Sequence, residues 1–132
     1  GGSCQYYLLI STQGPGKVPQ FGGGTLKFGG EDVLGFCATS LGLNTTGFWH
    51  MVLDGSAQGM PKNSTDSISA SDDGQTIYLT TASVFNVDAA SGGHSMVYVY
   101  NMVTESFSGP VFSAPANGLI TKVDGLHVGD LP

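Results

Sequence analysis

The feature that most constrains the fold of this chain is an internal repeat. Five short segments in the first half align, in the same order, with five segments in the second half. The aligned pairs are Leu9–Thr12 with Tyr78–Thr81, Glu31–Phe36 with His94–Val99, Thr46–Phe48 with Glu105–Phe107, Ala57–Met60 with Ala116–Leu119, and Asp66–Ala70 with Asp124–Val128. The offset falls from 69 to 58 residues because the second copy has shorter loops. Tandem repeats with periods of tens of residues are typical of solenoids, propellers and arrays.

Short apolar runs bounded by turn signals predict strands along the chain, and helix signals are nearly absent. The predicted strands are Tyr6–Ser11, Val33–Ala38, Phe48–Leu53, Ser67–Ser71, Ile77–Thr81, Ser95–Asn101, Phe107–Ser113 and Val123–Val128. Asp54-Gly55 and Asp72-Asp73-Gly74 predict tight turns, and the second of these is a strong hairpin signal. The Ser95–Asn101 run is apolar on both faces, as expected for a strand between neighbouring sheets. Pro110 suggests that Phe107–Ser113 is an edge strand. The sequence therefore predicts an all-β fold of antiparallel strands.

The complete repeating unit has four strands. They are Ser67–Ser71, Ile77–Thr81, Ser95–Asn101 and Phe107–Ser113. Four antiparallel strands per repeat match one blade of a β-propeller. In this respect the chain resembles the propeller-repeat proteins of cell surfaces and secreted fractions. The resemblance covers nearly the whole chain, and it implies two propeller-like blades. The Gly-His and Trp-Asp marks of the WD40 group and the kelch double glycine are missing, so no subfamily is named. A compact β-sandwich is the alternative fold.

The phase of the repeat predicts open strand edges. We expect a single β-repeat region over residues 1–132, with repeat one at about 4–71 and repeat two at about 72–130. The chain opens at strand two of one unit and closes just after strand one of a third, and such edges invite pairing. Three organisations stay open. The chain is a segment of a longer repeat protein, a subunit whose Val123–Val128 strand completes a neighbour in a ring or filament, or two repeats folded onto each other.

The charge balance argues against two classes of partner. Four Lys and no Arg stand against ten acidic residues, which gives a net charge of −6. Nucleic acids and anionic membranes bind clustered basic residues, so neither is expected as a partner. No apolar run is long enough to span a bilayer. Low charge with many Gly, Ser, Thr and Asn residues is usual for extracellular β-proteins, so we expect an extracellular or cell-surface location.

The two cysteines and two sequons fit this location. Cys4 and Cys37 lie in or beside predicted strands of the first repeat, and we expect them to form a disulfide, since such bonds are common outside the cell. Two free buried thiols are the alternative. Asn44-Thr45-Thr46 and Asn63-Ser64-Thr65 are N-glycosylation sequons in predicted loops, so Asn44 and Asn63 are candidate glycan sites.

No residue set rises to a catalytic motif. His50, His94 and His127 have no metal-ligand spacing, and no Cys-x-x-Cys or Gly-x-Ser-x-Gly occurs. Cys37 lies in an apolar run, which favours a structural role over nucleophilic chemistry. The acidic turns at Asp54 and Asp72-Asp73 resemble fragments of Ca²⁺ loops, but they lack the full spacing and are better explained as turns. We expect no enzyme, no cofactor and no catalytic or metal-binding residue, with Ca²⁺ as the weaker alternative.

Five residues are candidates for ligand contact. Phe48 and Trp49 are adjacent aromatics that could stack on a sugar ring, although a core role is the default. Glu31, Asp32 and His94 lie at equivalent strand starts of the two repeats. In a propeller, polar residues from several repeats can converge at one mouth, so these are the candidates for a central site.

The sequence therefore predicts a non-enzymatic extracellular structural or adhesive repeat module. It would assemble by strand pairing into a larger propeller, ring or filament. Its partners would be other copies of itself or further repeats of the same protein, with glycans as a further option. The alternative is part of a carbohydrate-binding or hydrolytic propeller whose site is completed by absent blades. Fold alone does not decide between them.

Overall fold

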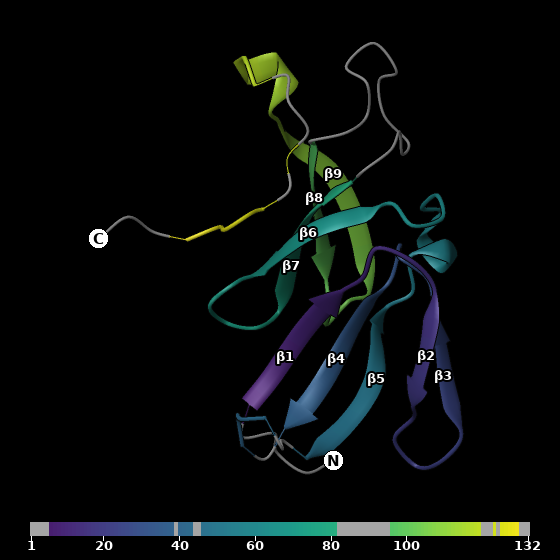
Figure 1. The fold of residues 1–132 in the computed structure, drawn as a ribbon. Helices are drawn as coiled ribbons and strands as arrows, with labels where there is room; N and C mark the ends of the chain where they lie inside the picture. The colour runs from purple at the N-terminus through teal and green to yellow at the C-terminus, as the bar shows by residue number, and fades with distance from the viewer. Residues whose placement is uncertain are drawn as a thin grey trace.

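The computed structural model describes residues 6–38, 40–43, 46–81, 96–119, 123 and 125–129. Over these residues the chain is all-β, and its strands form a three-stranded sheet, a four-stranded sheet and a two-stranded hairpin. All pairings between neighbouring strands are antiparallel. Figure 1 shows the four-stranded sheet packed across one end of the three-stranded sheet, with the hairpin beside them. The predicted all-β class is confirmed.

The first sheet has the strand order β1-β4-β5. Its strands are β1 (Tyr6–Ser11), β4 (Val33–Ala38) and β5 (Gly47–Leu53). The central strand β4 is buried along nearly its whole length, since it is flanked on both edges and apolar on both faces. This explains why its sequence, Val-Leu-Gly-Phe-Cys-Ala, does not alternate between apolar and polar residues.

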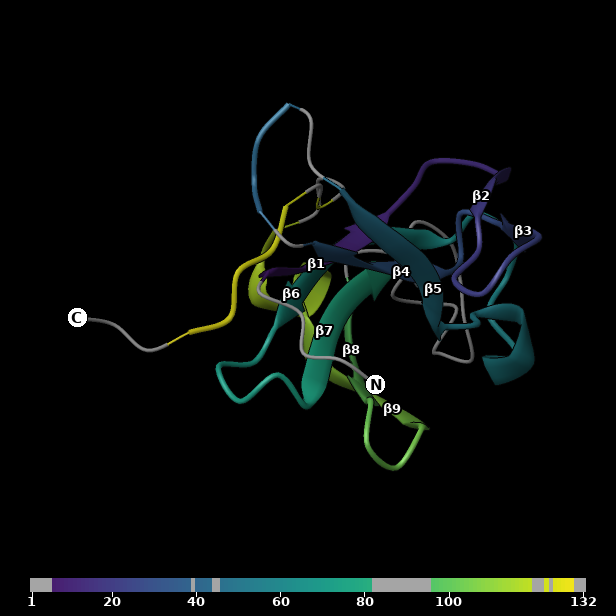
Figure 2. The ribbon, with the colours of Figure 1, turned by 90° about the horizontal axis from the view of Figure 1, so that it is seen from below.

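A separate hairpin follows β1 in the chain. It contains β2 (Gly16–Pro19) and β3 (Thr25–Phe28) and lies beside β5 in both views (Figures 1 and 2). Its turn uses Gly22, Gly23 and Gly24, whose φ angles are 87°, 111° and 80°. Glycine adopts such angles without a steric penalty. The triple glycine therefore forms a tight turn.

The second sheet is a meander of four strands in chain order. Its strands are β6 (Thr65–Ala70), β7 (Thr76–Thr81), β8 (Met96–Asn101) and β9 (Ser106–Ser113). In the turn between β6 and β7, Asp73 Oδ1 accepts hydrogen bonds from Ser71 Oγ at 2.6 Å and from the Gln75 N–H at 2.9 Å. Gly74 follows with a φ of 71°. The predicted Asp-Gly turn is therefore confirmed, and its acidic side chain is used within the turn.

Seven of the eight predicted strands are present within one to two residues of their expected bounds. Pro110 lies in β9, which is an edge strand as predicted. The predicted strand Val123–Val128 is wrong, since residues 123 and 125–129 form no strand in the structure. A first strand needs a second strand beside it, and no such partner pairs with this segment in the described residues. The hairpin of β2 and β3 was missed because its four-residue strands are short and contain Gly, Pro and Lys.

The pairing registers of the two sheets superpose row by row. With Ile10 placed on Leu79, as the sequence predicts, the row Ser11–Val33–Leu53 falls on Thr80–Val97–Phe112, and the row Leu8–Phe36–Trp49 falls on Ile77–Tyr100–Phe107. Each sheet also has a register shift at the same place, beside Leu34 in one and Tyr98 in the other.

This superposition corrects part of the sequence alignment. Val33 lies on Val97 and Trp49 lies on Phe107, so β4 and β5 are offset by 64 and 58 residues from β8 and β9. The sequence alignment of these two strands had offsets of 63 and 59, and each was wrong by one residue. A slip of one residue exchanges the two faces of a strand. Where both faces are apolar, as in β4 and β8, sequence alone does not detect it.

The turns that follow the last strand of each unit are identical in their backbone hydrogen bonds. Before η1 (Ser56–Gln58), Gly55 O accepts from the N–H groups of Gln58 at 3.0 Å and Met60 at 2.9 Å, and the Gly59 N–H donates to Ser56 O at 3.1 Å. The same three bonds recur 59 positions later, around η3 (Pro115–Asn117), at 3.0, 2.9 and 3.1 Å. The predicted match of Ala57–Met60 with Ala116–Leu119 is therefore confirmed.

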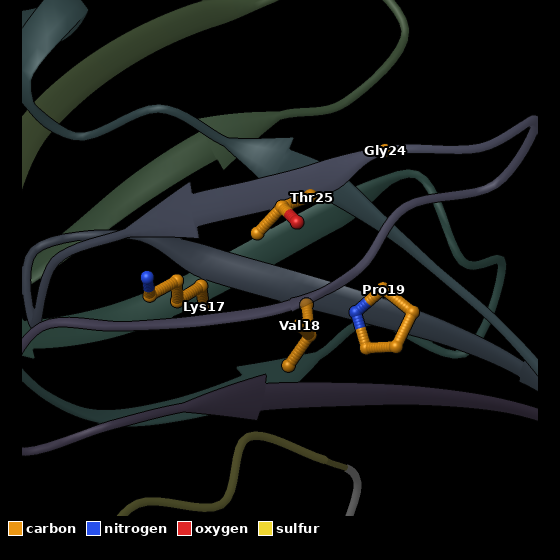
Figure 3. Close-up of a pocket in the computed structure, with 5 residues that line it drawn as sticks. All are labelled: Lys17, Val18, Pro19, Gly24 and Thr25. Atoms are coloured by element: carbon orange, nitrogen blue, oxygen red, sulfur yellow. The ribbon is translucent and has the colours of Figure 1, made fainter.

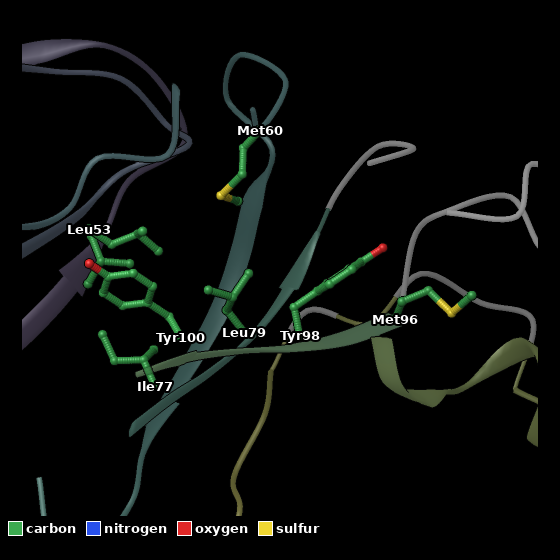
Figure 4. Packing of buried hydrophobic residues seen from close by; sticks show 8 residues of the cluster. Leu53, Met60, Ile77, Leu79, Met96, Tyr98 and Tyr100 are labelled. Carbon is green, nitrogen blue, oxygen red and sulfur yellow. The ribbon is translucent and has the colours of Figure 1, made fainter. Parts of the chain in front are cut away.

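The hydrophobic core forms where the second sheet packs on the first. It contains Val33 and Leu53 of the first sheet, Met60 of the following loop, and Ile77, Leu79, Met96, Tyr98 and Tyr100 of the second sheet. Figure 4 shows Leu53 directed at Ile77 and Tyr100 across this contact. The core therefore joins the two repeats into one folded body.

The two sheets contact each other through unlike faces. The core face of the second sheet contains Ile77, Leu79, Tyr98, Tyr100 and Phe107. Its equivalent in the first sheet, called the outer face here, contains Leu8, Ile10, Leu34, Phe36 and Trp49. The first sheet meets the core with its opposite face, which carries Leu9, Val33 and Leu53. Successive repeats in an array pack in this way, whereas a two-fold sandwich would bring like faces together.

Replacing Leu79 by Ala tests the core. Leu79 is fully buried, and truncation of such a residue removes apolar contacts and leaves a cavity. We expect the free energy of unfolding to fall by about 2–5 kcal/mol in urea unfolding. Val103→Ala is the matched control, because Val103 is 69% exposed. Equal effects of the two substitutions would contradict this assignment of the core.

Candidate functional site

Asp32 closes the turn that leads into β4. Its Oδ2 accepts a hydrogen bond from the Gly29 N–H at 2.8 Å, and its Oδ1 accepts one from the Gly55 N–H at 2.8 Å. The Asp32 N–H donates to Gly29 O at 3.1 Å. The carboxylate therefore links the start of β4 to the residues that follow β5, 23 positions away. Gly55 has no side chain, and this is required, because a Cβ there would overlap the Glu31 carbonyl group.

Glu31 ties the same turn to the second sheet. Its Oε1 accepts from the Asn63 N–H at 3.0 Å, and its carbonyl oxygen accepts from Thr65 Oγ1 at 2.9 Å. Gly30 adds two bonds, from its N–H to Asn63 Oδ1 at 2.9 Å and from the Thr65 N–H to its carbonyl oxygen at 3.1 Å. The Gly29–Asp32 turn is thus the hydrogen-bonded junction between the first sheet and β6.

These bonds revise the role predicted for the acidic pair. Glu31 and Asp32 are 9% and 5% exposed, and their carboxylates are engaged by backbone N–H groups. Burial raises the pKa of Asp32, and the nearby carboxylates of Glu31 and Asp54 raise it further, while the Gly29 and Gly55 N–H groups lower it. The pair acts in the junction between the repeats, which leaves little of either carboxylate for a ligand.

The aromatic candidates Phe48 and Trp49 point to opposite faces of β5. Phe48 packs against Phe21 of the β2–β3 turn, with ring centroids 4.2 Å apart. Trp49 packs against Phe36 of β4 on the outer face, with centroids 4.8 Å apart. Both side chains are half-buried. The structure therefore separates the two rings, and they do not form one sugar-stacking platform.

A tyrosine–histidine pair that the sequence did not reveal lies on the inner face of the first sheet. Tyr7 Oη and His50 Nε2 are 2.5 Å apart, and their rings are stacked at 5.3 Å. Gly35 lies between their strands, and a Cβ there would come within 2.5 Å of Tyr7 Oη and 2.9 Å of His50 Nε2. His50 Nδ1 is buried with no hydrogen-bond partner. The only sequence signal was a glycine in the middle of an apolar strand.

The open hollows of the surface show no catalytic arrangement. The hollow in Figure 3, of about 330 Å³, lies on the β2–β3 hairpin and is lined by Lys17, Val18, Pro19, Gly24 and Thr25. A second, of about 650 Å³, is lined by Pro15, Lys27, Phe28, Gly29, Glu31, Lys62 and Asn63. A third, of about 280 Å³, lies between the sheets and is lined by Met51, Val52, Asp54, Ala57, Gln58, Tyr100 and Glu105. None pairs a nucleophile with a base at hydrogen-bonding distance in the described residues.

Several predicted site residues cannot be placed. Cys4, Asn44 and His94 lie outside the described residues. Cys37 is buried and is not a free thiol, but its pairing with Cys4 stays a prediction. Asn63 is exposed in the loop before β6, as expected for a glycan site. The Asp54 turn is closed by Ser56 Oγ and the Ala57 N–H, at 2.8 and 3.3 Å. Within the described ranges, no three His, Cys, Asp or Glu side chains are grouped to hold a metal ion.

Comparison of the chain with protein-family models, with curated proteins and with solved structures found no match. In the part of the chain that the structure describes, no helix is long and apolar enough to cross a membrane.

Replacing Asp32 by Asn tests the junction. An amide offers one acceptor oxygen where the carboxylate offers two, so the N–H of Gly29 or Gly55 would face an NH₂ group. We expect the free energy of unfolding to fall by about 1–3 kcal/mol, the cost of an unsatisfied buried donor. Asp72→Asn removes the same charge from the exposed β6–β7 turn and is the control. A similar small effect for both variants would contradict the role of Asp32.

The buried imidazole of His50 predicts a pH dependence of stability. Burial lowers the pKa of His50 below its model value of 6.5. As the pH falls through that value, the unfolded chain binds a proton that the folded chain does not, so the free energy of unfolding decreases. His50→Gln should remove this part of the decrease between about pH 7.5 and about pH 5 in urea unfolding. His127→Gln, at an exposed position, should leave it unchanged; if His50→Gln also left it unchanged, the assignment would be wrong.

Proposed function

We propose that this chain is a non-enzymatic extracellular module with a structural or adhesive role, whose repeats stack with further copies or repeats in a larger propeller, ring or filament. The observation that carries the proposal is the contact between unlike faces of the two sheets. This contact is a rule that can be applied again, because each unit has one face of each kind.

The outer face of the first sheet has the surface expected of a face that awaits a neighbour. Leu8 is 36% exposed, and Ile10, Phe36 and Trp49 are half-buried. Their equivalents in the second sheet, Ile77, Leu79, Tyr98 and Tyr100, are at most 4% exposed, because the first sheet covers them. Burial of apolar area contributes about 25 cal/mol per Å². A further layer on the outer face would therefore be stabilising.

The opposite end of the stack is also apolar. Val111 and Phe112 of β9 are 58% and 50% exposed. Phe112 lies in the row of Val97 and Thr80, on the face of the second sheet that is turned away from the core. This face is equivalent to the one with which the first sheet meets the core. The two ends of the molecule thus carry complementary kinds of face.

The hydrogen bonds of Glu31 and Asp32 favour this proposal over a carbohydrate-binding or hydrolytic site. These residues were the acidic candidates for such a site, and both are buried in the junction between the repeats. The extracellular part of the proposal rests on the low charge, the exposed sequon at Asn63 and the absence of a free thiol at Cys37.

The mass and shape of the native particle test the proposal. Light scattering and electron microscopy of material from its source should show a particle larger than the 13.6 kDa chain, with repeats stacked in a ring or a rod. Trp49 is the only tryptophan and lies on the outer face, so its fluorescence should shift to shorter wavelength on assembly. A native particle of 13.6 kDa with unchanged Trp49 emission on concentration would overturn the proposal.

A further inference from the structure

Strand β1 is paired along only one edge. It bonds to β4, and the described residues contain no strand on its other side. Its equivalent, β7, is paired on both edges, with β6 and with β8. The first sheet therefore lacks the strand that corresponds to β6. An edge of this kind presents unpaired N–H and C=O groups to any strand that fits.

The segment from Gly125 to Val128 has the sequence pattern of the missing strand. It aligns with Ser67–Ala70 of β6 at an offset of 58 residues. Leu126 and Val128 are half-buried, while Gly125 and His127 are exposed, so its side chains alternate as in a strand. It pairs with no strand in the described residues. It lies beside β6, where the Val128 N–H donates to Ser69 Oγ at 3.0 Å.

We propose that Gly125–Val128 of one copy adds antiparallel to the free edge of β1 in a second copy. This inference rests on the proposed function, which it deepens by naming the partner and the pairing. In the second sheet, Ile68 pairs with Leu79 and Ala70 pairs with Ile77. The repeat offsets of 58 and 69 carry these pairs over to Leu126 with Ile10 and Val128 with Leu8.

The register agrees with the chemistry of both faces. Leu126 and Val128 join Ile10 and Leu8 on the outer face, as Ile68 joins Leu79 in the second sheet. His127 falls opposite Leu9 at the position of Ser69, on the other face. A shift of one residue would place His127 on the apolar outer face and Val128 among polar neighbours. The pattern therefore specifies one register.

The added strand comes from a second copy because the first copy's own second sheet blocks the way. Ser69, which holds Val128, points away from the face that carries Ile68 and the core. The segment therefore lies on the far side of the second sheet from β1 of the same chain. Pairing between different surfaces of two copies is head to tail, and it builds rings or filaments. It also continues the existing contact between unlike sheet faces.

Substitution of the donor strand tests the proposal. Leu126→Pro removes an N–H and the apolar side chain, and Leu126→Ile is the matched control. In analytical ultracentrifugation of the full chain, Leu126→Pro should weaken self-association about tenfold or more, from the loss of one hydrogen bond and one buried side chain. Leu126→Ile should associate like the parent chain. Since Leu126 lies outside every strand, both variants should keep the parent's melting temperature.

A mixing experiment tests the head-to-tail arrangement. Leu8→Lys places a charge where Val128 would dock and should also abolish self-association. A mixture of Leu8→Lys, with its intact donor, and Leu126→Pro, with its intact β1 edge, should form a heterodimer and nothing larger. Unchanged association of Leu126→Pro would overturn the strand addition and leave the proposed stacking in place. A parent chain that stays monomeric at all concentrations would also overturn it, while the native particle would still decide the proposed function.

Discussion

The relation between the two repeats depends on the carboxylate of Asp32. Its two oxygens accept from Gly29 and Gly55, which fixes the entry to β4 against the exit from β5. The same turn bonds to Asn63 and Thr65, which begin the second sheet. Apolar packing by itself is non-directional. The orientation of one sheet on the other is therefore set by these directional bonds, and the core fills the space that they define.

Much of the fold could be predicted from the sequence because strands are local. The runs at Tyr6–Ser11 and Val33–Ala38 coincide with β1 and β4, and the Asp73-Gly74 turn joins β6 to β7 as expected. The failures are non-local. Residues 125–128 have a strand pattern but no partner to pair with. The repeat offsets slipped by one residue in β4 and β5, since apolar residues on both faces hide the register.

The candidate site was harder to predict for a related reason. Glu31 and Asp32 stood out as an acidic pair, but their partners Asn63 and Gly55 are distant in sequence, so their role in the junction was invisible. The aromatic pair Phe48 and Trp49 was read as one surface, although neighbours in a strand point to opposite faces. Tyr7 and His50 come together because Gly35 leaves room between their strands. Contacts across a sheet depend on a register that sequence supplies only in part.

The junction has a consequence for the order of events in biosynthesis. The sequon Asn63-Ser64-Thr65 is part of it: Asn63 Oδ1 accepts from the Gly30 N–H, and the Thr65 hydroxyl is 4% exposed and bonded to Glu31 O. An enzyme that reads the threonine as well as the asparagine finds both only while this turn is open. A glycan on Asn63 would therefore record that the chain was modified before its two halves met. Its occupancy would then measure how fast the junction closes in the cell.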